Sequence, residues 1–490
     1  ELWTNAKVVS LMNFGLKELP DRGPVCSATS TLFLQKNEKL VGIPPSFFDH
    51  MSTLKLLDLY RTGIRSLPPS ISNLANLKGL YLNDCHKLVH LPEEMEQLGN
   101  LELLDICRTG IHGFHAVIGM LSHLRCLRVS FTSVVSDQNS VKANGVGVTL
   151  SNIIQRLLHL EELTVDADPK DPEWNRIAGD IAAQAAMLEK LSTLSFYFPS
   201  SESLEKFTKH SIAWKKGNPQ SGNNSMSFNI YVYTERTHKS PRFDVYECSG
   251  KRYLRYSDGE DSPDVIKEVL SRTCAFELLA HNGIEYFSDF GIDEMKYLQV
   301  CRVEGCNAMI AFFHSQPPIT PAFQWLKELH LCQLHHLDAI CKGPIAEGSF
   351  ARLTTLNVDE CPNLVAVVSW DMAEQLVKLE HLKVKSCPRV KEIIATDSQS
   401  REAGKFVELK TLELEDLEGL DSIHSNGSFK WPELEKVKIK NCKNLNDLCL
   451  STTNAPKLRR VECNRTWWET TGKLNDDVKA NLQRLCCFFN

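Results

Sequence analysis

Cysteine is the residue type in this sequence with the widest choice of chemistry. The chain has 490 residues, of which 17 are cysteines. Thiols at this density can form disulfides, hold a metal ion or take part in redox reactions. However, the count is odd, and no two cysteines are separated by two residues, as they are in common metal-binding and redox-active motifs. The role of the cysteines therefore has to be read from the pattern in which they occur.

The motifs of common enzyme classes are missing from the sequence. A phosphate-binding loop requires G-x-x-x-x-G-K followed by Ser or Thr. The Gly-Lys pairs that begin at Gly250, Gly404 and Gly472 are instead followed by Arg, Phe and Leu. Neither H-E-x-x-H nor G-x-S-x-G occurs. We therefore expect no enzyme activity and no cofactor in this chain.

Charge and hydropathy exclude two classes of partner. The 55 basic and 61 acidic side chains give a net charge of −6, which provides no electrostatic attraction toward nucleic acid. No uninterrupted apolar stretch approaches the roughly 18–20 residues that a membrane span needs, and the chain does not start with a signal segment. We expect neither a nucleic-acid partner nor a membrane span.

Leucines recur at a regular spacing in two long runs. In the first run the template L-x-x-L-x-L-x-x-T begins at Leu54 and returns at Leu77, Leu101 and Leu124, after 23, 24 and 23 residues. The second run begins at Leu298. Its next repeats start 24 to 30 residues apart, at Leu326, Leu353, Leu379, Leu409, Leu434 and Leu458. This spacing and period are those of the leucine-rich repeat.

The repeat predicts an α/β fold built from stacked coils, a leucine-rich-repeat solenoid. In an extended segment, residues two apart point to the same side, so Leu57 and Leu59 face the core and Asp58 faces outward. One coil cannot bury its apolar edge alone, whereas stacked coils join these edges into a continuous core and pair their strands in parallel. We expect a curved horseshoe with the strands on its concave face, and loops and short helices on its convex side.

The repeat gives some of the cysteines a structural role. At the turn after the strand, this repeat commonly places Asn or Cys at an inward-facing position. A buried thiol behaves there as a compact apolar group with a weak hydrogen-bond donor. Free thiols in such a role fit a reducing compartment. Five cysteines occupy this turn position: Cys85, Cys306, Cys361, Cys387 and Cys442.

The spacing divides the chain into four segments. Regular repeats are predicted for 1–199 and 297–465, and a closing cap for 466–490. Between them, 200–296 is predicted to hold degenerate repeats with long loop excursions. Short alternating stretches within this part, at 228–232 and 276–278, are predicted to be strands. The helical spacing of 177–191 predicts a helix.

The outward strand positions form the candidate site, because no catalytic group competes with them. Tyr, Arg and charged side chains at such positions are types that anchor protein interfaces. Opposite charges on adjacent strands can equally satisfy one another, so a docking face and a self-satisfied charge ladder both remain open. Phe131 is also predicted to point outward. The candidate residues are Asp58, Tyr60, Tyr81, Asp105, Arg128 and His330, followed by the sign-alternating rows Lys383, Glu413, Lys438 and Lys385, Glu415, Lys440.

The amino-acid sequence of the repeats resembles that of one protein family. Residues 67–85, LPPSISNLANLKGLYLNDC, look like the repeats of plant intracellular immune receptors of the nucleotide-binding leucine-rich-repeat family. The opening 6–12, AKVVSLM, resembles the start of that region in the coiled-coil subclass. The Cys-Pro units at Cys361 and Cys387 and the Trp467-Trp468 ending are also similar to that subclass.

The resemblance implies a recognition and autoinhibition module. In that family, such a module holds a nucleotide-binding module inactive. It releases that module on meeting a pathogen effector or a guarded host protein, which triggers defence and hypersensitive cell death. The resemblance further implies a cytoplasmic protein. It also implies intramolecular contact with nucleotide-binding and coiled-coil domains, with ATP or ADP held on a module upstream of this chain.

Two other functions remain open on the sequence alone. A leucine-rich-repeat substrate adaptor of a ubiquitin ligase would have an F-box-like segment upstream. An extracellular receptor or inhibitor would have paired cysteines at both ends of the repeats. The chain starts at Glu1 with a repeat already running by Val8, so we expect further protein upstream to cover the first coil.

Overall fold

The computed structural model divides the chain into two compact units, which are described separately. Unit 1 is Glu1–Arg242 and unit 2 is Phe243–Asn490. The boundaries predicted at 199, 296 and 465 stay predictions. The structure describes residues 3, 5–111, 114–131, 152–168, 171–217, 226–233, 252–291, 295–315, 320–395, 406–424, 430–445, 450, 454–470 and 483–489.

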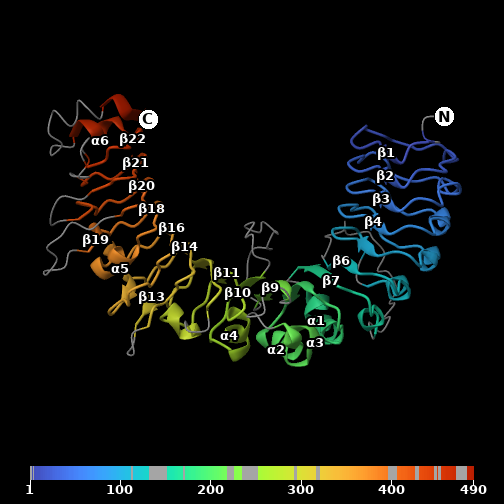
Figure 1. Ribbon diagram of the computed structural model, residues 1–490, viewed down its shortest axis with the longest axis horizontal. Coiled ribbons are helices and arrows are strands. Elements are labelled where there is room, and N and C mark those ends of the chain that lie inside the picture. Colours follow the sequence, from blue (N-terminus) through green and yellow to red (C-terminus); the bar gives the residue numbers. More distant parts are fainter. Residues whose placement is uncertain are drawn as a thin grey trace. The chain divides into compact units, whose positions relative to one another are not determined.

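Unit 1 contains one parallel sheet in which the described strands follow each other in chain order (Figure 1). The strands are β1 (Val8–Ser10), β2 (Thr31–Phe33), β3 (Leu56–Asp58), β4 (Gly79–Tyr81), β5 (Leu103–Asp105), β6 (Cys126–Phe131), β7 (Glu162–Ala167), β8 (Thr193–Phe198) and β9 (Ser227–Tyr233). The return segments carry the 3-10 helices η1 (Pro69–Asn73), η2 (Glu93–Gln97), η3 (Ala116–Met120) and η4 (Ile154–Arg156), then α1 (Pro172–Ala186), α2 (Ser201–His210) and α3 (Ile212–Lys216).

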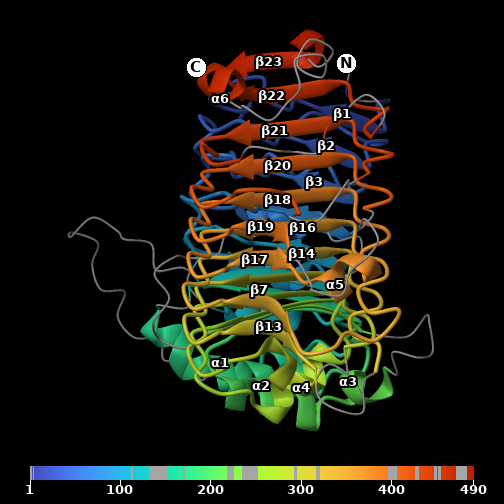
Figure 2. The same ribbon diagram turned by 90° about the vertical axis from the view of Figure 1, so that its left-hand side faces the viewer.

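Unit 2 repeats this arrangement, and Figure 2 shows its strands stacked from β14 to β23. Its main sheet holds β10 (Arg252–Ser257), β11 (Ala275–Leu279), β12 (Val300–Glu304), β14 (Glu328–Cys332), β16 (Thr355–Asp359), β18 (His381–Lys385), β20 (Thr411–Glu415), β21 (Lys436–Lys440), β22 (Arg460–Asn464) and β23 (Cys486–Phe489). The return segments hold α4 (Asp264–Leu270), η6 (Phe287–Phe290), α5 (Trp370–Gln375), α6 (Arg465–Thr470), η8 (Gln483–Leu485) and the small parallel pairs β13 (Ala311–His314) with β15 (Ala339–Lys342) and β17 (Ala366–Val368) with β19 (Glu392–Ile394).

The leucine template forms the core of both units. In β3, Leu57 is fully buried between two half-exposed neighbours, and Leu59, which follows the strand, is fully buried as well. The leucines of the template are buried in the same way in the other coils, and each stabilises the fold by about 1.5–3 kcal/mol. The leucine-rich-repeat fold predicted from the spacing is therefore confirmed. The strands predicted at 228–232 and 276–278 are β9 and β11, and the predicted helix is α1.

In nine coils the strand ends in a bend that is held by a left-handed, non-glycine residue and is followed by a buried residue. The next residue is the turn position, whose side chain points into the core. Few non-glycine residues adopt a positive φ, yet here φ lies between +52° and +62° in nine coils. The left-handed residues of these coils are Lys36, Arg61, Asp84, Arg108, Gln333, Glu360, Ser386, Asp416 and Asn441.

The side chain at the turn position bonds backbone carbonyls, including that of the preceding coil. In the β2 coil, Asn37 is fully buried and its Nδ2 donates to the carbonyls of Leu11 (2.9 Å) and Leu34 (2.7 Å). Its Oδ1 accepts from the backbone N–H of Leu16 at 3.1 Å. In the β4 coil, the Sγ of Cys85 donates to the carbonyl of Leu59 at 3.1 Å.

All five turn-position cysteines are buried and free, as predicted from the repeat. Burial raises the pKa of Cys306 to about 12 and that of Cys442 to about 11. Their thiols therefore keep the proton that they donate. The Sγ of Cys442 donates to the carbonyl of Leu414 in the preceding coil at 3.6 Å.

The end of unit 2 covers the last long strand. Strand β23 pairs in parallel with β22. Trp467 and Trp468 of α6 are 6% and 7% exposed, and the indole N–H of Trp467 donates to the carbonyl of Leu445 at 3.2 Å. The cap predicted for 466–490 stays a prediction, and its middle part, 471–482, lies outside the described residues.

Replacing Asn37 by Ala is predicted to destabilise the protein by about 2–4 kcal/mol, because one buried and two partly buried backbone groups lose their partner. Asn37→Cys retains one donor and should cost less. Asn76→Ala is the matched control: Asn76 is exposed and donates only to the carbonyl of Ser52, so its loss should cost less than about 1 kcal/mol. Urea unfolding followed by circular dichroism measures the difference. Equal costs at both positions would contradict the role of the turn position.

Candidate functional site

The strand register places four of the five predicted site residues of unit 1 in one row, and Tyr60 follows the end of β3. Asp58 on β3 is opposite Tyr81 on β4, which is opposite Asp105 on β5, which is opposite Arg128 on β6. We call the surface on which these outward residues lie the open sheet face. The predicted row is thus confirmed as an arrangement, whereas its role in binding stays a prediction.

Two of these residues close a local turn. The backbone N–H of Tyr60 donates to Asp58 Oδ1 at 2.9 Å, and that of Cys107 donates to Asp105 Oδ1 at 3.1 Å. Burial raises the pKa of both carboxyl groups, while these backbone bonds counteract the rise. The same Asp-x-x pattern therefore ends the third and the fifth strand.

Arg128 links three strands of unit 1 through charge. Its Nε donates to Glu162 Oε1 at 2.8 Å, and its Nη1 lies 3.5 Å from Asp105 Oδ2. Asp105 is only 5% exposed, so this pairing compensates a carboxylate that would otherwise be desolvated. Glu162 was not among the predicted residues. Its signal was present in the sequence, because it occupies the first position of the next long strand on the same face.

The outward orientation predicted for Phe131 is wrong. Phe131 is 6% exposed and packs on Phe114 and Trp174, with ring centroids 5.3 and 5.0 Å away. Strand β6 is six residues long, so the alternation continues beyond Val129 and turns Phe131 to the core side.

The register of unit 2 confirms both predicted rows. His330 is opposite Asn357, which is opposite Lys383; Glu413 and Lys438 continue the row on β20 and β21. In the second row, Lys385, Glu415 and Lys440 are opposite one another on β18, β20 and β21.

The charges on this face do not pair along the rows as the ladder prediction assumed. Lys438 pairs diagonally with Glu415, across the two rows. Lys385 pairs within its row, but with Asp359 on β16 at 3.8 Å and not with Glu415 on β20. Glu462, which follows Lys438 in the first row, pairs with Arg460 (2.7 Å) and Lys436 (3.4 Å).

Glu415 is the most enclosed carboxylate of this network, at 7% exposed. Burial raises the pKa of Glu415, but the hydrogen bond and the positive charge of Lys438 outweigh that effect, so the pKa lies below its ordinary value. The same bond raises the pKa of Lys438. Both groups are therefore charged at neutral pH and hold β20 to β21.

Three charged residues of the predicted rows are left over. Within the part of the chain that the structure describes, Lys383, Glu413 and Lys440 have no ion-pair partner. A recess of about 300 Å³ lies beside Lys383. It is lined by His330, Thr355, Leu356, Asn357, His381, Leu382, Lys383, Thr411 and Glu413.

His330 is part of this recess. Its side chain is 14% exposed and its Nε2 lies 3.4 Å from Glu328 Oε2. Burial lowers the pKa of His330, while Glu328 counteracts this, so the imidazole is neutral at pH 7. Among the described residues, no group of three His, Cys, Asp or Glu side chains is placed to hold a metal ion.

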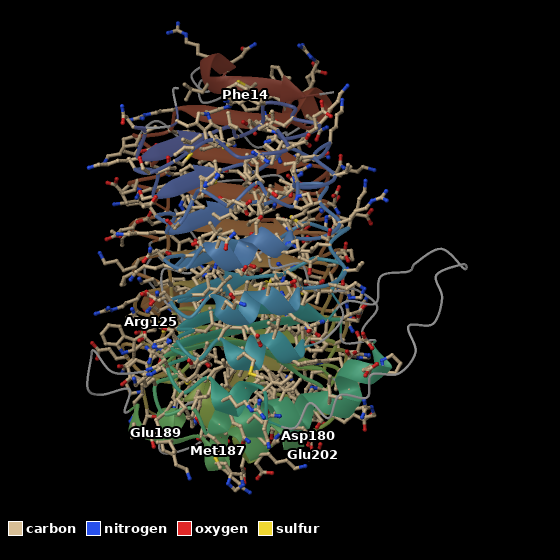
Figure 3. All side chains as sticks on the ribbon, turned by 90° about the vertical axis from the view of Figure 1, so that its right-hand side faces the viewer. Phe14, Arg125, Asp180, Met187, Glu189 and Glu202 are labelled. Atoms are coloured by element: carbon tan, nitrogen blue, oxygen red, sulfur yellow. The ribbon has the colours of Figure 1, made fainter. Side chains whose placement is uncertain are left out.

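A second row of charges, which the candidate residues did not include, follows one edge of unit 1. Lys78 pairs with Glu102 at 2.6 Å, and Arg125 pairs with Glu161 at 2.9 Å and with Glu102 at 3.9 Å. Figure 3 shows Arg125 at this edge. The signal was in the repeat, since each of these residues directly follows the first leucine of its coil.

Comparisons with known proteins agree with this geometry. Residues 325–462 match the family described as plant disease resistance protein RPS2-like, leucine-rich repeats, and residues 35–201 match a leucine-rich repeat region. A disease resistance protein of Arabidopsis thaliana is 28% identical over 98% of this chain and 47% of its own length. The chain is a leucine-rich-repeat region that is similar to those of plant disease resistance proteins.

Two further similarities describe the extent of this leucine-rich-repeat region. Disease resistance protein RPS5 of Arabidopsis thaliana is 28% identical over 42% of the chain and 21% of its own length. The region thus spans about half or less of these relatives. A solved leucine-rich-repeat protein of Leptospira interrogans covers 99% of the chain, and the chain covers 96% of it, at 16% identity and a TM-score of 0.40. Within the described residues, no helix is both long enough and apolar enough to cross a membrane.

Stability of the leucine-rich-repeat region is predicted to fall between about pH 4 and pH 6 through Asp166. Burial raises the pKa of this carboxyl to about 6, with Arg108 opposing the rise and Asp168 adding to it. A raised pKa means that stability is highest below the unfolded pKa and is lost as the group ionises in the folded protein. Asp166→Asn should remove this loss and raise the free energy of unfolding at pH 7 by about 1–3 kcal/mol.

Thermal unfolding between pH 4 and pH 7.5 tests this prediction. Asp180→Asn is the matched control, because Asp180 is exposed on α1 (Figure 3). Its melting profile should follow that of the wild type. An unchanged pH profile in Asp166→Asn would contradict the prediction.

The substitution Lys438→Met, which removes the amine, is predicted to destabilise unit 2 by about 1–3 kcal/mol, because Glu415 stays buried without its counter-charge. Lys440→Met, two residues along the same strand, removes an unpaired amine and should change stability by less than about 0.5 kcal/mol. Hydrogen exchange of the β20 and β21 amides reports the difference locally. The double variant Glu415→Gln/Lys438→Met should recover part of the loss. Equal effects of the two lysine variants would argue against the pair.

Proposed function

We propose that this leucine-rich-repeat region is the recognition and autoinhibition part of an intracellular plant immune receptor. It acts by protein contact and not by catalysis. In the resting receptor it holds a nucleotide-binding module, which carries ATP or ADP, and a coiled-coil domain inactive in the cytoplasm. Contact with a pathogen effector or a guarded host protein releases them, which leads to defence and hypersensitive cell death.

The observation that carries the proposal is the open sheet face of both units. Parallel strands present polar and aromatic side chains in fixed rows, and solenoid proteins use such extended faces for binding. The similarity to plant disease resistance proteins supports the biological setting. Because the chain covers less than half of that relative, the nucleotide-binding and coiled-coil modules belong to the proposal.

One surface can serve both autoinhibition and recognition if the docked domain and the external partner compete for it. A partner shifts the receptor toward its active state only as far as it binds that state better than the resting one. A charge-paired face suits this exchange, since buried charge pairs give specificity more readily than net affinity. The Glu415–Lys438 pair lies on such a face in unit 2, between β20 and β21.

Exchanging these two charges separates docking from folding. The double variant Glu415→Lys/Lys438→Glu keeps an ion pair between β20 and β21 but reverses the pattern that a docked domain meets. In the complete receptor, transiently expressed in leaves, this variant is predicted to cause cell death without any effector. Ion leakage should rise several-fold over the wild type at equal protein level, because the exchanged charges no longer match the domain that docks on this face in the resting receptor.

The matched control is Glu433→Lys/Lys457→Glu. This pair is joined at 2.6 Å and lies where the charges are 37% and 52% exposed, before the strands begin. It should behave as the wild type. Leakage at the wild-type level in both variants would contradict an autoinhibitory role for this face. A complete coding sequence without a G-x-x-x-x-G-K-[ST] loop would contradict the receptor itself, and an F-box-like segment in its place would favour a ubiquitin-ligase adaptor.

A further inference from the structure

The part of the open sheet face of unit 2 that β16, β18, β20, β21 and β22 form has an excess of positive charge, although the whole chain is negative. The outward positions of β16, β18, β20, β21 and β22 hold six basic and four acidic residues, against a net charge of −6 for the chain. The basic residues are Lys383, Lys385, Lys436, Lys438, Lys440 and Arg460; the acidic ones are Asp359, Glu413, Glu415 and Glu462.

Ion pairs within the face leave this excess on two lysines. Asp359, Glu415 and Glu462 are each paired with lysine or arginine. Among the described residues, Lys383 and Lys440 have no ion-pair partner. Glu413 is the one acidic residue of this group of ten charged residues that also has none. A carboxylate that arrives at Lys383 or Lys440 therefore displaces no existing ion pair, although Glu413, which lies opposite Lys383 and lines the same recess, opposes part of the Coulomb gain at Lys383.

The recess beside Lys383 adds hydrogen-bond donors to the positive charge. Besides the ammonium of Lys383, its wall includes the hydroxyl groups of Thr355 and Thr411. Thr411 Oγ1 lies 2.6 Å from the Nδ1 of His381, and this hydroxyl can donate to a ligand when that nitrogen carries the proton. Charged acceptors form the stronger hydrogen bonds with such donors. A recess of about 300 Å³ holds one acidic side chain.

The sheet fixes the distance between the two free lysines. Lys383 lies on β18 and Lys440 on β21, two strands away and in the neighbouring row. Strands are about 4.8 Å apart and residues rise by about 3.3 Å, which places the two positions about 12 Å from each other. Two carboxylates match this span when they are four residues apart on an extended segment, or seven to eight apart on a helix.

We propose that the partner of this face is an acidic protein segment that places one carboxylate on Lys383, in the recess, and a second on Lys440. This inference rests on the proposed recognition function and gives it a chemical class of partner. A nucleic acid fits less well. Its phosphates follow each other at one charge per 1.7 Å of duplex axis, and they would meet the carboxylates of Asp359, Glu413, Glu415 and Glu462 between the lysines.

Selection of displayed peptides from a random 16-residue library on the full 490-residue chain tests the inference. Enriched peptides are expected to carry two acidic residues at the spacings given above. Their affinity should fall about tenfold or more for Lys383→Glu/Lys440→Glu, and also when sodium chloride is raised from 50 to 300 mM. Peptides with the two acids changed to lysine should bind the double variant better than the wild type, because the charge complementarity is restored.

The matched control is Lys17→Glu/Lys206→Glu, which makes the same charge change at exposed lysines of unit 1 and should bind like the wild type. Enriched peptides that lack the acidic pair but still lose binding in Lys383→Glu/Lys440→Glu would overturn the acidic partner and leave the proposed recognition function standing. Binding that survives this variant, or no enrichment at all, would overturn the site. Tighter binding of a 20-nucleotide DNA than of any selected peptide would favour nucleic acid instead. The leaf assay tests the proposed function separately.

Discussion

The contact between each coil and the next is the interaction on which the rest of this structure depends. A single coil has one apolar edge and a strand of three to seven residues, too little to be stable alone. The strand ladder joins neighbouring coils through their backbones, and the turn-position side chain ties one coil to a carbonyl of the coil before it, as Asn37 and Cys85 do. The open sheet face is a by-product of this stacking, because the inward residues fix the direction of the outward ones.

The same contact explains why most charges on the open face are already paired. Adjacent strands bring outward side chains to within reach of one another, so a carboxylate that neighbours cover has to find a counter-charge there. Asp105 and Glu415 are such carboxylates, and Arg128 and Lys438 compensate them. A charge that remains unpaired in this setting, such as that of Lys383, is therefore more informative about a partner than the many charges around it.

The repeat spacing was sufficient to predict the fold, the rows and the buried cysteines, because each follows from the alternation of a strand and the fixed position of the turn. The pairing of charges was not predictable in the same way. Whether Lys438 bonds to Glu413 in its own row or to Glu415 diagonally depends on side-chain rotamers and on which carboxylate is desolvated. Phe131 was misplaced for a different reason: the usual strand of this repeat was assumed to end before it, whereas β6 continues.

The left-handed residue before each turn position has a consequence for how such a surface changes over generations. Since consecutive coils such as those of β2 to β5 share the same bend, a stretch that runs from one left-handed residue to the next is a complete, exchangeable unit. Loss or duplication of such a stretch leaves the remaining bends, and the stacking that they impose, as they were. It brings together two coils that were not adjacent before, so that a lysine such as Lys440 acquires new neighbours when the coil next to its own is lost or duplicated, although its own codon is unchanged.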